Sequence, residues 1–359
     1  MIPLALPAHA EPGDAYVARL SRNACQDAVT LSLVEEADGS AAYAGRRGLV
    51  TIEGADCDAL EGDIVLVTPS KGRVERLVRP GSQHNTLLVT ERCDQLCVMC
   101  SQPPKKTHDD RFALFEQACL LARHDAVIGI TGGEPLLYKD DVFGLIERVL
   151  TARPGMSFHV LTNGQHFERT DVERLTHPVY RRVQWGIPLY APTASAHDAI
   201  VGKCGAFARL EDSLATLACA GASIELRTVV LTTNASELPL LAIRVARRLP
   251  FIATWSIMQL ENIGFAKNRW NSLRFDHALD FAPIASALDT AAIHGITAQL
   301  FNFPRCTVPV GYRDYAVASI SDWKQRFATV CTGCRERSAC SGFFEWHPTD
   351  EMEARATPL

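Results

Sequence analysis

The sequence predicts an α/β protein whose central unit is an open, partial barrel of about six β–α units. From Asn85 to about Gly264, β-prone runs alternate with stretches that repeat apolar residues every three or four positions, which is typical of alternating strands and helices. The flanking segments differ, because the first 84 residues contain only short strand-like runs and the last part contains four cysteines. We therefore divide the chain into residues 1–84, 85–267 and 268–359.

The N-terminal part is predicted to be a small β-rich domain. Three strand-like runs are bounded by Gly, Asp and Pro, at 48–54, 62–67 and 73–78. The last run alternates charged and apolar residues, as a strand with one buried face does. The sequence indicates no task for this domain, and both substrate docking and plain packing remain open.

The central part supplies the strands and helices of the predicted barrel. The predicted strands are 86–90, 127–130, 157–162, 183–189, 224–231 and 251–260, and the predicted helices are 111–124, 141–152, 206–220 and 237–248. Strands that are joined through helices pair in parallel and place the helices outside the sheet. Six such units are too few to close an eight-stranded barrel, so we expect an open sheet.

Composition excludes several classes of protein. The net charge of −5 and the pI near 6.1 argue against a nucleic-acid-binding surface, which needs clustered Lys and Arg. No apolar run approaches the ~20 residues of a membrane span, and the N-terminus lacks the basic region of a signal peptide. We therefore expect a cytoplasmic protein that binds neither nucleic acid nor membrane. Without an export signal, twelve cysteines indicate metal ligation rather than disulfides.

Cys93, Cys97 and Cys100 form a C-x3-C-x2-C loop after the first central strand. The carboxyl ends of strands are where α/β proteins bind their ligands. A [4Fe–4S] cluster usually takes four cysteines, so three would leave one iron open to a small molecule, as catalytic zinc keeps an open position. The alternative is a zinc site, because a C-x2-C pair is often half of one. The nearest histidines, His84 and His108, lack zinc-finger spacing.

Two turns follow the second and third predicted strands. Gly132 and Gly133 leave the backbone exposed, and Glu134 adds a carboxylate, so this turn can bind a ligand ammonium group. Thr162 and Asn163 precede Gly164 in the next turn, although these residue types also suit a plain left-handed turn.

A second set of cysteines lies near the C-terminus. Its members are Cys306, Cys331, Cys334 and Cys340, and the last three have C-x2-C-x5-C spacing. Four thiolates can fully ligate one iron–sulfur cluster. A four-cysteine zinc ribbon would use the same ligands.

The motifs TERCDQLCVMC, TGGEPLL and LTNG together resemble those of radical S-adenosylmethionine (SAM) enzymes. The resemblance implies a partial (β/α)6 TIM-like barrel of the radical SAM type. It also implies a [4Fe–4S] cluster on the first three cysteines, with SAM on the open iron. In the family the Gly-Gly-Glu turn holds the amino group of SAM, which implies that role for Gly132, Gly133 and Glu134, with Thr162 and Asn163 at the same site.

Several positions extend this resemblance or depart from it. Met99 stands where the family has an aromatic residue near the adenine, and a thioether can fill the same apolar role. Pro188 replaces a serine that often contacts SAM. Arg227 is a candidate for the SAM carboxylate, because arginine binds carboxylates bidentately, although a salt bridge to Glu225 or to another acidic residue is the alternative. His197 and Asp198 correspond to a family His-Asp pair and are expected to fix a loop, not to catalyse.

The C-terminal cysteines resemble the auxiliary-cluster domain of peptide-modifying radical SAM enzymes, called SPASM. Phe344 stands where the full pattern has a further cysteine, so the shorter twitch form with one auxiliary [4Fe–4S] cluster matches better. With the segments Ser319–Lys324 and C-S-G-F-F, the chain is most similar to the radical SAM maturases of the His-Xaa-Ser system, the HxsC family. That resemblance implies a ribosomally made precursor peptide with His-Xaa-Ser repeats as substrate. It also implies a flavodoxin- or ferredoxin-type electron donor and a second radical SAM maturase as partners.

The predicted activity is reductive cleavage of SAM to a 5′-deoxyadenosyl radical, which abstracts hydrogen from the peptide so that an oxidative cross-link forms. An alternative is peptide epimerisation, which needs a hydrogen donor such as Cys204. A different class of protein, a non-catalytic zinc protein that binds a partner, also stays open.

Overall fold

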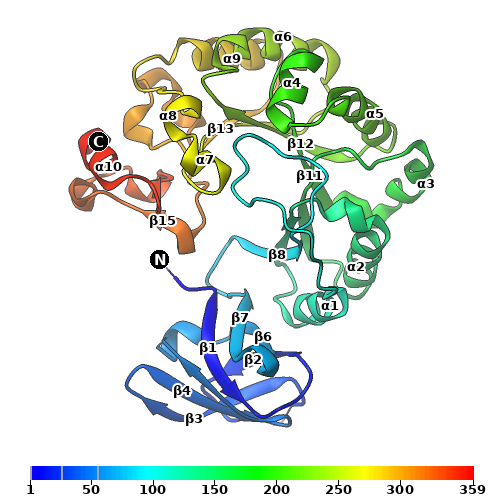
Figure 1. The fold of residues 1–359 in the computed structure, drawn as a ribbon, viewed down its shortest axis with the longest axis vertical. Helices are drawn as coiled ribbons and strands as arrows, with labels where there is room; N and C mark the ends of the chain where they lie inside the picture. The colour runs from blue at the N-terminus through cyan, green and yellow to red at the C-terminus, as the bar shows by residue number, and fades with distance from the viewer. Residues whose placement is uncertain (1, 26, 55) are drawn as a thin grey trace.

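The computed structural model describes all residues except 1, 26 and 55, and it consists of three parts (Figure 1). The N-terminal part is a closed seven-stranded barrel with the strand order β1-β5-β4-β3-β2-β6-β7. Its strands are β1 (Ala5–Ala10), β2 (Tyr16–Ser21), β3 (Thr30–Ala37), β4 (Ser40–Gly45), β5 (Gly48–Glu53), β6 (Ile64–Thr68) and β7 (Arg73–Val78). The β-rich character predicted for this part is confirmed, and the structure adds β1 to β4, which the sequence pattern did not reveal.

The central part is a parallel sheet with the order β14-β13-β12-β11-β10-β9-β8. Its strands are β8 (Asn85–Thr90), β9 (Val127–Gly132), β10 (Ser157–Leu161), β11 (Val183–Pro188), β12 (Ser223–Val230), β13 (Thr254–Gln259) and β14 (Ala298–Phe301). Every strand pair in this sheet is parallel. The predicted α/β class with a parallel sheet is therefore confirmed.

The sheet has one strand more than the six that were predicted. β14 pairs with β13 from Trp255↔Ala298 to Met258↔Phe301, so the sheet continues past residue 267, where the predicted central domain ended. β14 has only four residues, and the preceding helix α9 (Ala282–Ile293) is apolar on most sides. Neither element has the clear periodicity by which the other units were found.

Helices pack their apolar residues against one side of the sheet, which curves into an arc (Figure 1). These helices are α1 (Phe112–Leu121), α2 (Lys139–Ala152), α3 (Val172–Leu175), α5 (Ala206–Cys219), α6 (Leu238–Arg248) and α9, whereas α4 (Ala194–Val201), α7 (Phe265–Asn268) and α8 (Trp270–Leu273) contribute to a separate apolar cluster with Met99. In α2 the buried residues, among them Val142, Ile146 and Val149, recur every three or four positions and face the sheet. No helix of the described residues is long and apolar enough to cross a membrane.

The two faces of the central sheet differ in chemistry, because successive strand residues point to opposite faces. One face is apolar and fully buried against the helices, and includes Ile130, Val160, Trp185, Leu226, Trp255 and Ile257. The opposite face carries polar side chains, among them His159, Gln184, Glu225, Arg227 and Ser256. The helix-free face is therefore the one that is suited to polar ligands.

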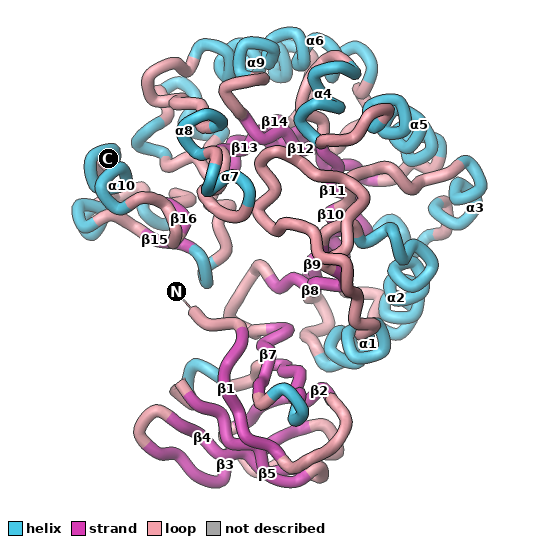
Figure 2. The backbone as a smooth tube through the Cα atoms, viewed as in Figure 1, coloured by secondary structure: helices cyan, strands magenta, loops and turns pink. Residues whose placement is uncertain are grey.

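The C-terminal part contains little regular structure (Figure 2). β15 (Gln325–Arg326) pairs antiparallel with β16 (Phe343–Phe344), and α10 (Thr349–Arg355) follows. Two bidentate ion pairs fasten this part to the rest of the protein. The guanidinium of Arg355 binds Asp276, and that of Arg79 binds Asp322 at 2.8 and 2.6 Å.

Candidate functional site

The first cysteine loop follows β8 and brings Cys93, Cys97 and Cys100 close together. Burial, followed by the nearness of Cys100 and Cys93, raises the pKa of the Cys97 thiol to about 12. Burial also raises the pKa of Cys93, to about 11. These thiols therefore ionise at neutral pH only when a bound cation compensates their charge, as happens when a metal binds thiolates. Three clustered, partly buried thiols on one loop thus fit a metal centre.

The backbone of this loop is held by neighbouring elements on two sides. The amides of Leu96 and Val98 donate to the carbonyls of Val201 and Ile200 at the end of α4, at 3.0 and 2.9 Å. Beyond β13, the amide of Phe265 donates to the carbonyl of Cys100 at 2.8 Å. The loop is thus fixed by the structure around it.

The Gly-Gly turn after β9 lies directly against the cysteine loop. A Cβ atom on Gly133 would lie 2.2 Å from the carbonyl oxygen of Arg92 and 2.9 Å from the Cβ of Cys93. A Cβ on Gly132 would lie 2.3 Å from the carbonyl oxygen of Thr90. These separations are far below van der Waals contact, so both positions require glycine. The glycines allow the turn to approach the first cysteine, and their binding of a ligand amine stays a prediction.

Glu134 joins the turns that follow β9 and β10. Its side chain is fully buried and accepts hydrogen bonds from the Thr162 hydroxyl at 2.7 Å, the Leu136 amide at 2.8 Å and the Asn163 amide. Burial raises the pKa of this carboxyl. The structure therefore brings Glu134, Thr162 and Asn163 together, and among the described residues the carboxylate already has three protein donors. This arrangement indicates that Glu134 positions the turns, while direct contact with SAM remains untested.

Asp94, inside the cysteine loop, is a residue that the sequence reasoning missed. Its carboxylate accepts a hydrogen bond from the side-chain amide of Asn163 at 2.7 Å and forms an ion pair with Lys203, and His166 Nε2 lies 3.4 Å away. Burial alone would raise the pKa of Asp94, but these three partners together lower it well below its usual range. Asp94 thereby ties the loop to the turn after β10 and to the segment after α4. Its place between two cysteines was the only signal in the sequence.

Arg227 and Glu225 form a polar network on the helix-free face of the sheet. Arg227 lies 2.9 Å from both oxygens of Glu225, so the salt bridge that was the alternative for Arg227 is present. His159 reaches Glu225 at 2.7 Å, and Ser256 also donates to it. Burial opposes ionisation of Glu225, but the hydrogen bond from His159 and the charge of Arg227 lower its pKa to about 2. Binding of the SAM carboxylate by Arg227 stays a prediction.

Tyr190, just after β11, lies near both the cysteine loop and Arg227. Burial raises the pKa of Tyr190, nearby Cys97 raises it further, and Arg227 opposes both. The sequence predicted no role for this tyrosine. Met99 is buried in a neighbouring apolar cluster with Ile200, Leu260 and Trp270. Met99 therefore fills an apolar position beside the loop, and a contact with adenine remains an expectation.

Helix α4 carries the loop-fixing residues His197 and Asp198, and Cys204 lies in the segment between α4 and α5. His197 Nδ1 accepts from the Tyr190 amide at 3.3 Å, and Asp198 accepts from the amides of Gly205 and Phe207 at 2.6 and 2.8 Å. The predicted loop-fixing role of His197 and Asp198 is therefore confirmed. Cys204 is exposed and follows Lys203, the partner of Asp94. The structure thus leaves the predicted hydrogen-donor role of Cys204 untested.

The four C-terminal cysteines gather around one small cavity, which Pro304, Phe327 and Phe343 also line. The four are Cys306, Cys331, Cys334 and Cys340. The amides of Arg305 and Gly342 point at the sulfur of Cys340, at 3.3 and 3.4 Å. Such N–H···S contacts accompany and tune thiolate-bound metal centres. The set fits one metal centre with four sulfur ligands, and these contacts suit iron–sulfur and zinc alike.

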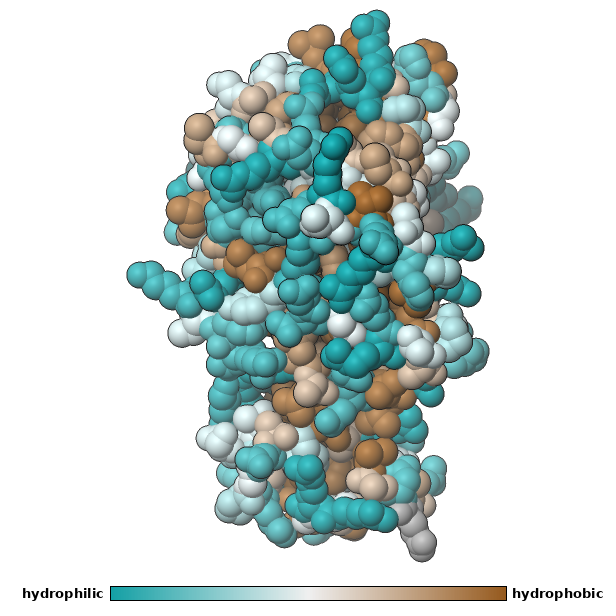
Figure 3. Space-filling model, turned by 90° about the vertical axis from the view of Figure 1, so that its right-hand side faces the viewer, coloured by the Kyte–Doolittle hydropathy of each residue, from teal (hydrophilic) through white to brown (hydrophobic). Residues whose placement is uncertain are grey.

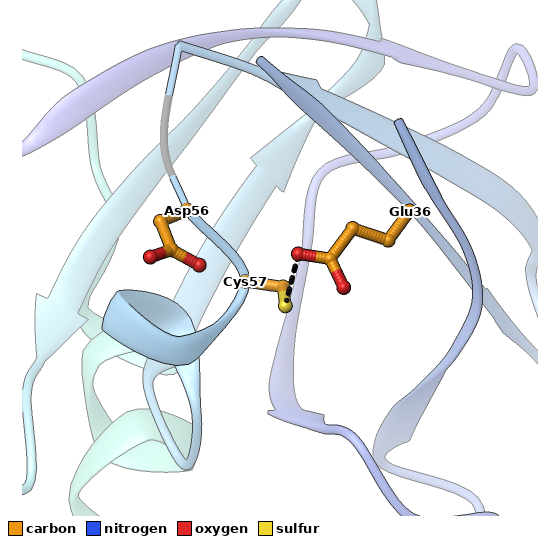
Figure 4. Close-up of side chains that lie close together, drawn as sticks. All are labelled: Glu36, Asp56 and Cys57. Carbon is orange, nitrogen blue, oxygen red and sulfur yellow. Dashed lines mark hydrogen bonds between the residues drawn. The ribbon is translucent and has the colours of Figure 1, made fainter. Parts of the chain in front are cut away.

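A third group of possible metal ligands lies in the N-terminal barrel, where Glu36, Asp56 and Cys57 approach one another (Figure 4). The Cys57 thiol donates to Glu36 at 2.9 Å. Both carboxylates are exposed, and Arg22 lies beside Glu36 at 3.9 Å. The thiol is already hydrogen-bonded, and both carboxylates are solvated near an arginine. We therefore do not assign a metal site to this group.

Solved structures similar to this chain include proteins with bound S-adenosylmethionine. Streptococcus suis SuiB bound to S-adenosylmethionine is 14% identical with a TM-score of 0.48, over 60% of this chain and 49% of that one. Native anSMEcpe with bound AdoMet and the Cp18Cys peptide is 12% identical with a TM-score of 0.48, over 60% and 62%. A radical SAM methyltransferase from Sphaerobacter thermophilus is 16% identical with a TM-score of 0.44, over 76% and 77%.

These similarities are distant. The chain spans about half the length of the SuiB structures that it resembles. No protein-family model matches the chain, and no curated protein does. At such identities and TM-scores, the chemistry of this chain has to be inferred from its own residues.

Proposed function

We propose that this protein is a radical SAM enzyme that modifies a ribosomally made peptide. The observation that carries the proposal is the packing of the C-x3-C-x2-C loop against the Gly-Gly-Glu turn, which is so close that a Cβ atom on Gly133 would lie 2.9 Å from the Cβ of Cys93. A three-thiol loop leaves a metal centre with an open position. The turn beside it supplies backbone groups for a bound amine, so both halves of a SAM-chelating site meet at one edge of the sheet.

In this proposal Cys93, Cys97 and Cys100 hold a [4Fe–4S] cluster. When bound, that cluster supplies the electron that breaks SAM into methionine and a 5′-deoxyadenosyl radical. Gly132 and Gly133 give SAM room and backbone contacts, and Glu134 fixes the neighbouring Thr162–Asn163 turn. Arg227, anchored on Glu225, offers its remaining N–H groups to the SAM carboxylate. Met99 and the apolar cluster around it exclude water from one side of the loop.

The proposed substrate is a precursor peptide with His-Xaa-Ser repeats, and the proposed product is an oxidative cross-link. The four C-terminal cysteines would hold an auxiliary [4Fe–4S] cluster that accepts the electron released when the substrate radical forms a new bond. A flavodoxin- or ferredoxin-type protein would supply electrons, and a second radical SAM maturase would act on the same peptide. The second candidate reaction is epimerisation, which the exposed thiol of Cys204 favours as a hydrogen donor.

Anaerobic reconstitution with iron and sulfide tests the proposal. We expect a brown protein that releases 5′-deoxyadenosine from SAM when dithionite is added, and a C93A/C97A/C100A variant that releases none. If the protein retains zinc instead and produces no 5′-deoxyadenosine, it belongs to the class of zinc-binding interaction proteins.

Mass spectrometry of the peptide then separates the two reactions. A cross-link removes two hydrogens from the peptide, whereas epimerisation leaves its mass unchanged in normal water and adds deuterium in heavy water. A C204A variant provides a second criterion, because only epimerisation depends on a thiol donor.

A further inference from the structure

A cleft of about 700 Å³ lies between the segment that joins the N-terminal barrel to β8 and the C-terminal cysteines. Residues 81–84 form one wall, and Phe327 and the loop that contains Cys334 and Cys340 form another. Two of the four C-terminal cysteines thus line an open hollow. The candidate metal centre is therefore reachable from solvent on this side.

The rim of the cleft carries positive charge without compensation. Arg335 and Arg337 are exposed, and neither has an acidic partner among the described residues, although the Arg337 guanidinium stacks 4.8 Å from the ring centre of Phe327. Asp322, the one carboxylate among the lining residues, is already bound by Arg79. In a chain of net charge −5, this rim is a local positive surface, and such a surface attracts an acidic partner.

A short series of contacts links the cleft to the first cysteine loop. Gln325 lines the cleft and donates to the carbonyl of Ser341 at 2.9 Å. The ammonium of the preceding Lys324 lies 3.4 Å from Glu261. Farther along the segment that begins with Glu261, Phe265 donates to the carbonyl of Cys100. Hydrogen bonds and one ion pair thus connect the segment beside the cleft to the first cysteine loop.

We infer that the cleft is the docking site of an acidic, one-electron carrier protein of the flavodoxin type, held by Arg335 and Arg337. The inference rests on the proposed function, which consumes one electron for each SAM cleaved. That electron leaves the reduced flavin of the carrier and is used to break the C5′–S bond of SAM, giving methionine and the 5′-deoxyadenosyl radical. Docking at the cleft brings the carrier beside Cys334 and Cys340. Charge complementarity orients the carrier and speeds its association.

Direct binding provides the first test. Oxidised bacterial flavodoxin is titrated onto the full, cluster-loaded protein at low ionic strength and followed by surface plasmon resonance. Reversing both rim charges with R335E/R337E should weaken binding about tenfold or more, and R335Q should have a smaller effect. The control R247E/R248E reverses two exposed arginines at the end of α6. It should bind flavodoxin like the unchanged protein, and all variants should retain the same iron content and unfolding midpoint.

The second test compares two reductants. With flavodoxin as donor, R335E/R337E should release 5′-deoxyadenosine about tenfold more slowly, whereas dithionite needs no docking surface and should support an unchanged rate. Equal flavodoxin binding by R335E/R337E and the unchanged protein would overturn the inference, as would equal losses in both arginine pairs. If the rim variant instead loses only affinity for a synthetic His-Xaa-Ser peptide, the cleft binds substrate and the inference is wrong. Failure of the unchanged protein to cleave SAM with dithionite refutes the proposed function, while the binding experiment still decides the docking site.

Discussion

The side-chain amide of Asn163 donates a hydrogen bond to the carboxylate of Asp94 at 2.7 Å. One residue belongs to the cysteine loop and the other to the turn after β10, so this contact sets the distance between two parts of the candidate SAM site. Lys203 binds the same carboxylate from the segment after α4. Three chain segments therefore meet at the side chain of Asp94. Asp94 itself is not a candidate ligand of the metal centre.

Replacing Asp94 with Asn should weaken iron binding at the first cysteine site. The variant loses the ion pair with Lys203, and removal of groups that orient metal ligands typically costs about 10–100-fold in metal affinity. The measurement is iron retained against a graded chelator, with the C-terminal site as an internal reference. D212N, an exposed change on α5, should retain iron normally; equal retention by D94N would show that the loop orders itself without Asp94.

Gly133→Ala should abolish the first cluster without unfolding the protein. The added methyl group would overlap the Arg92 carbonyl oxygen at 2.2 Å, so the turn and the loop would have to separate. Electron paramagnetic resonance of the reduced protein should then lose the signal that responds to SAM. In G311A the new Cβ meets no atom within 4 Å, so this control should keep the signal.

Glu134→Gln should destabilise the protein. Two donors face one carboxylate oxygen and a third faces the other, and Gln presents an N–H₂ group to at least one of them. An unsatisfied buried polar group costs about 1–3 kcal/mol, which urea unfolding monitored by circular dichroism can resolve. E173Q, at an exposed position of α3, is the matched control. A stability of E134Q equal to that of E173Q would contradict the assigned hydrogen bonds.

The ionised side chain of Glu225 should contribute to the free energy of unfolding at neutral pH, and this contribution should be lost in acid. Its pKa is about 2 in the folded protein and about 4.3 in an unfolded chain. Because the folded value is the lower one, its contribution is complete above about pH 4.3 and disappears as the pH falls toward 2. The size of this contribution is on the order of 3 kcal/mol.

Urea unfolding at a series of pH values from about 6 to 3 measures this contribution. E225Q cannot titrate, so its free energy of unfolding should fall less steeply with acid than that of the unchanged protein. E173Q should follow the unchanged protein. Parallel pH profiles for E225Q and the unchanged protein would mean that Glu225 is not held ionised by His159 and Arg227.

Cys331→Ala should remove about four iron atoms per chain and leave the first site loaded. The four C-terminal cysteines line one cavity, so loss of one ligand disables that centre alone. Iron analysis combined with SAM-dependent spectra distinguishes the two sites. C219A, which removes an exposed cysteine outside both groups, should change neither.

The sequence predicted the central fold well where strands and helices are long and periodic. The predicted strand at 183–189 and the helix at 206–220 agree within a residue with β11 and α5. β14 was not predicted, because four residues are too few to show a periodicity. In the N-terminal barrel, β4 reads Ser-Ala-Ala-Tyr-Ala-Gly, and small residues of this kind give no hydrophobic alternation.

The candidate site was predictable only where a motif fixes both residue type and spacing. The cysteine positions and the Gly-Gly-Glu turn could be read directly, but the partners of Asp94 lie 69 and 109 residues away in the chain. Nothing in the sequence indicates which distant side chains a partly buried carboxylate will meet. Glu134 itself could be identified from the sequence motif. Its three hydrogen-bond donors could be identified only from the structure.

The N-terminal barrel is closed, and each of its seven strands has a neighbour on both sides. A sheet without a free edge cannot recruit an extended peptide as an additional strand, the way many domains capture unstructured segments. Figure 3 shows hydrophobic and hydrophilic residues interspersed on the face that it draws. If this domain docks the peptide substrate, it must therefore do so through side chains and loops, and the backbone of that peptide contributes little to its selection.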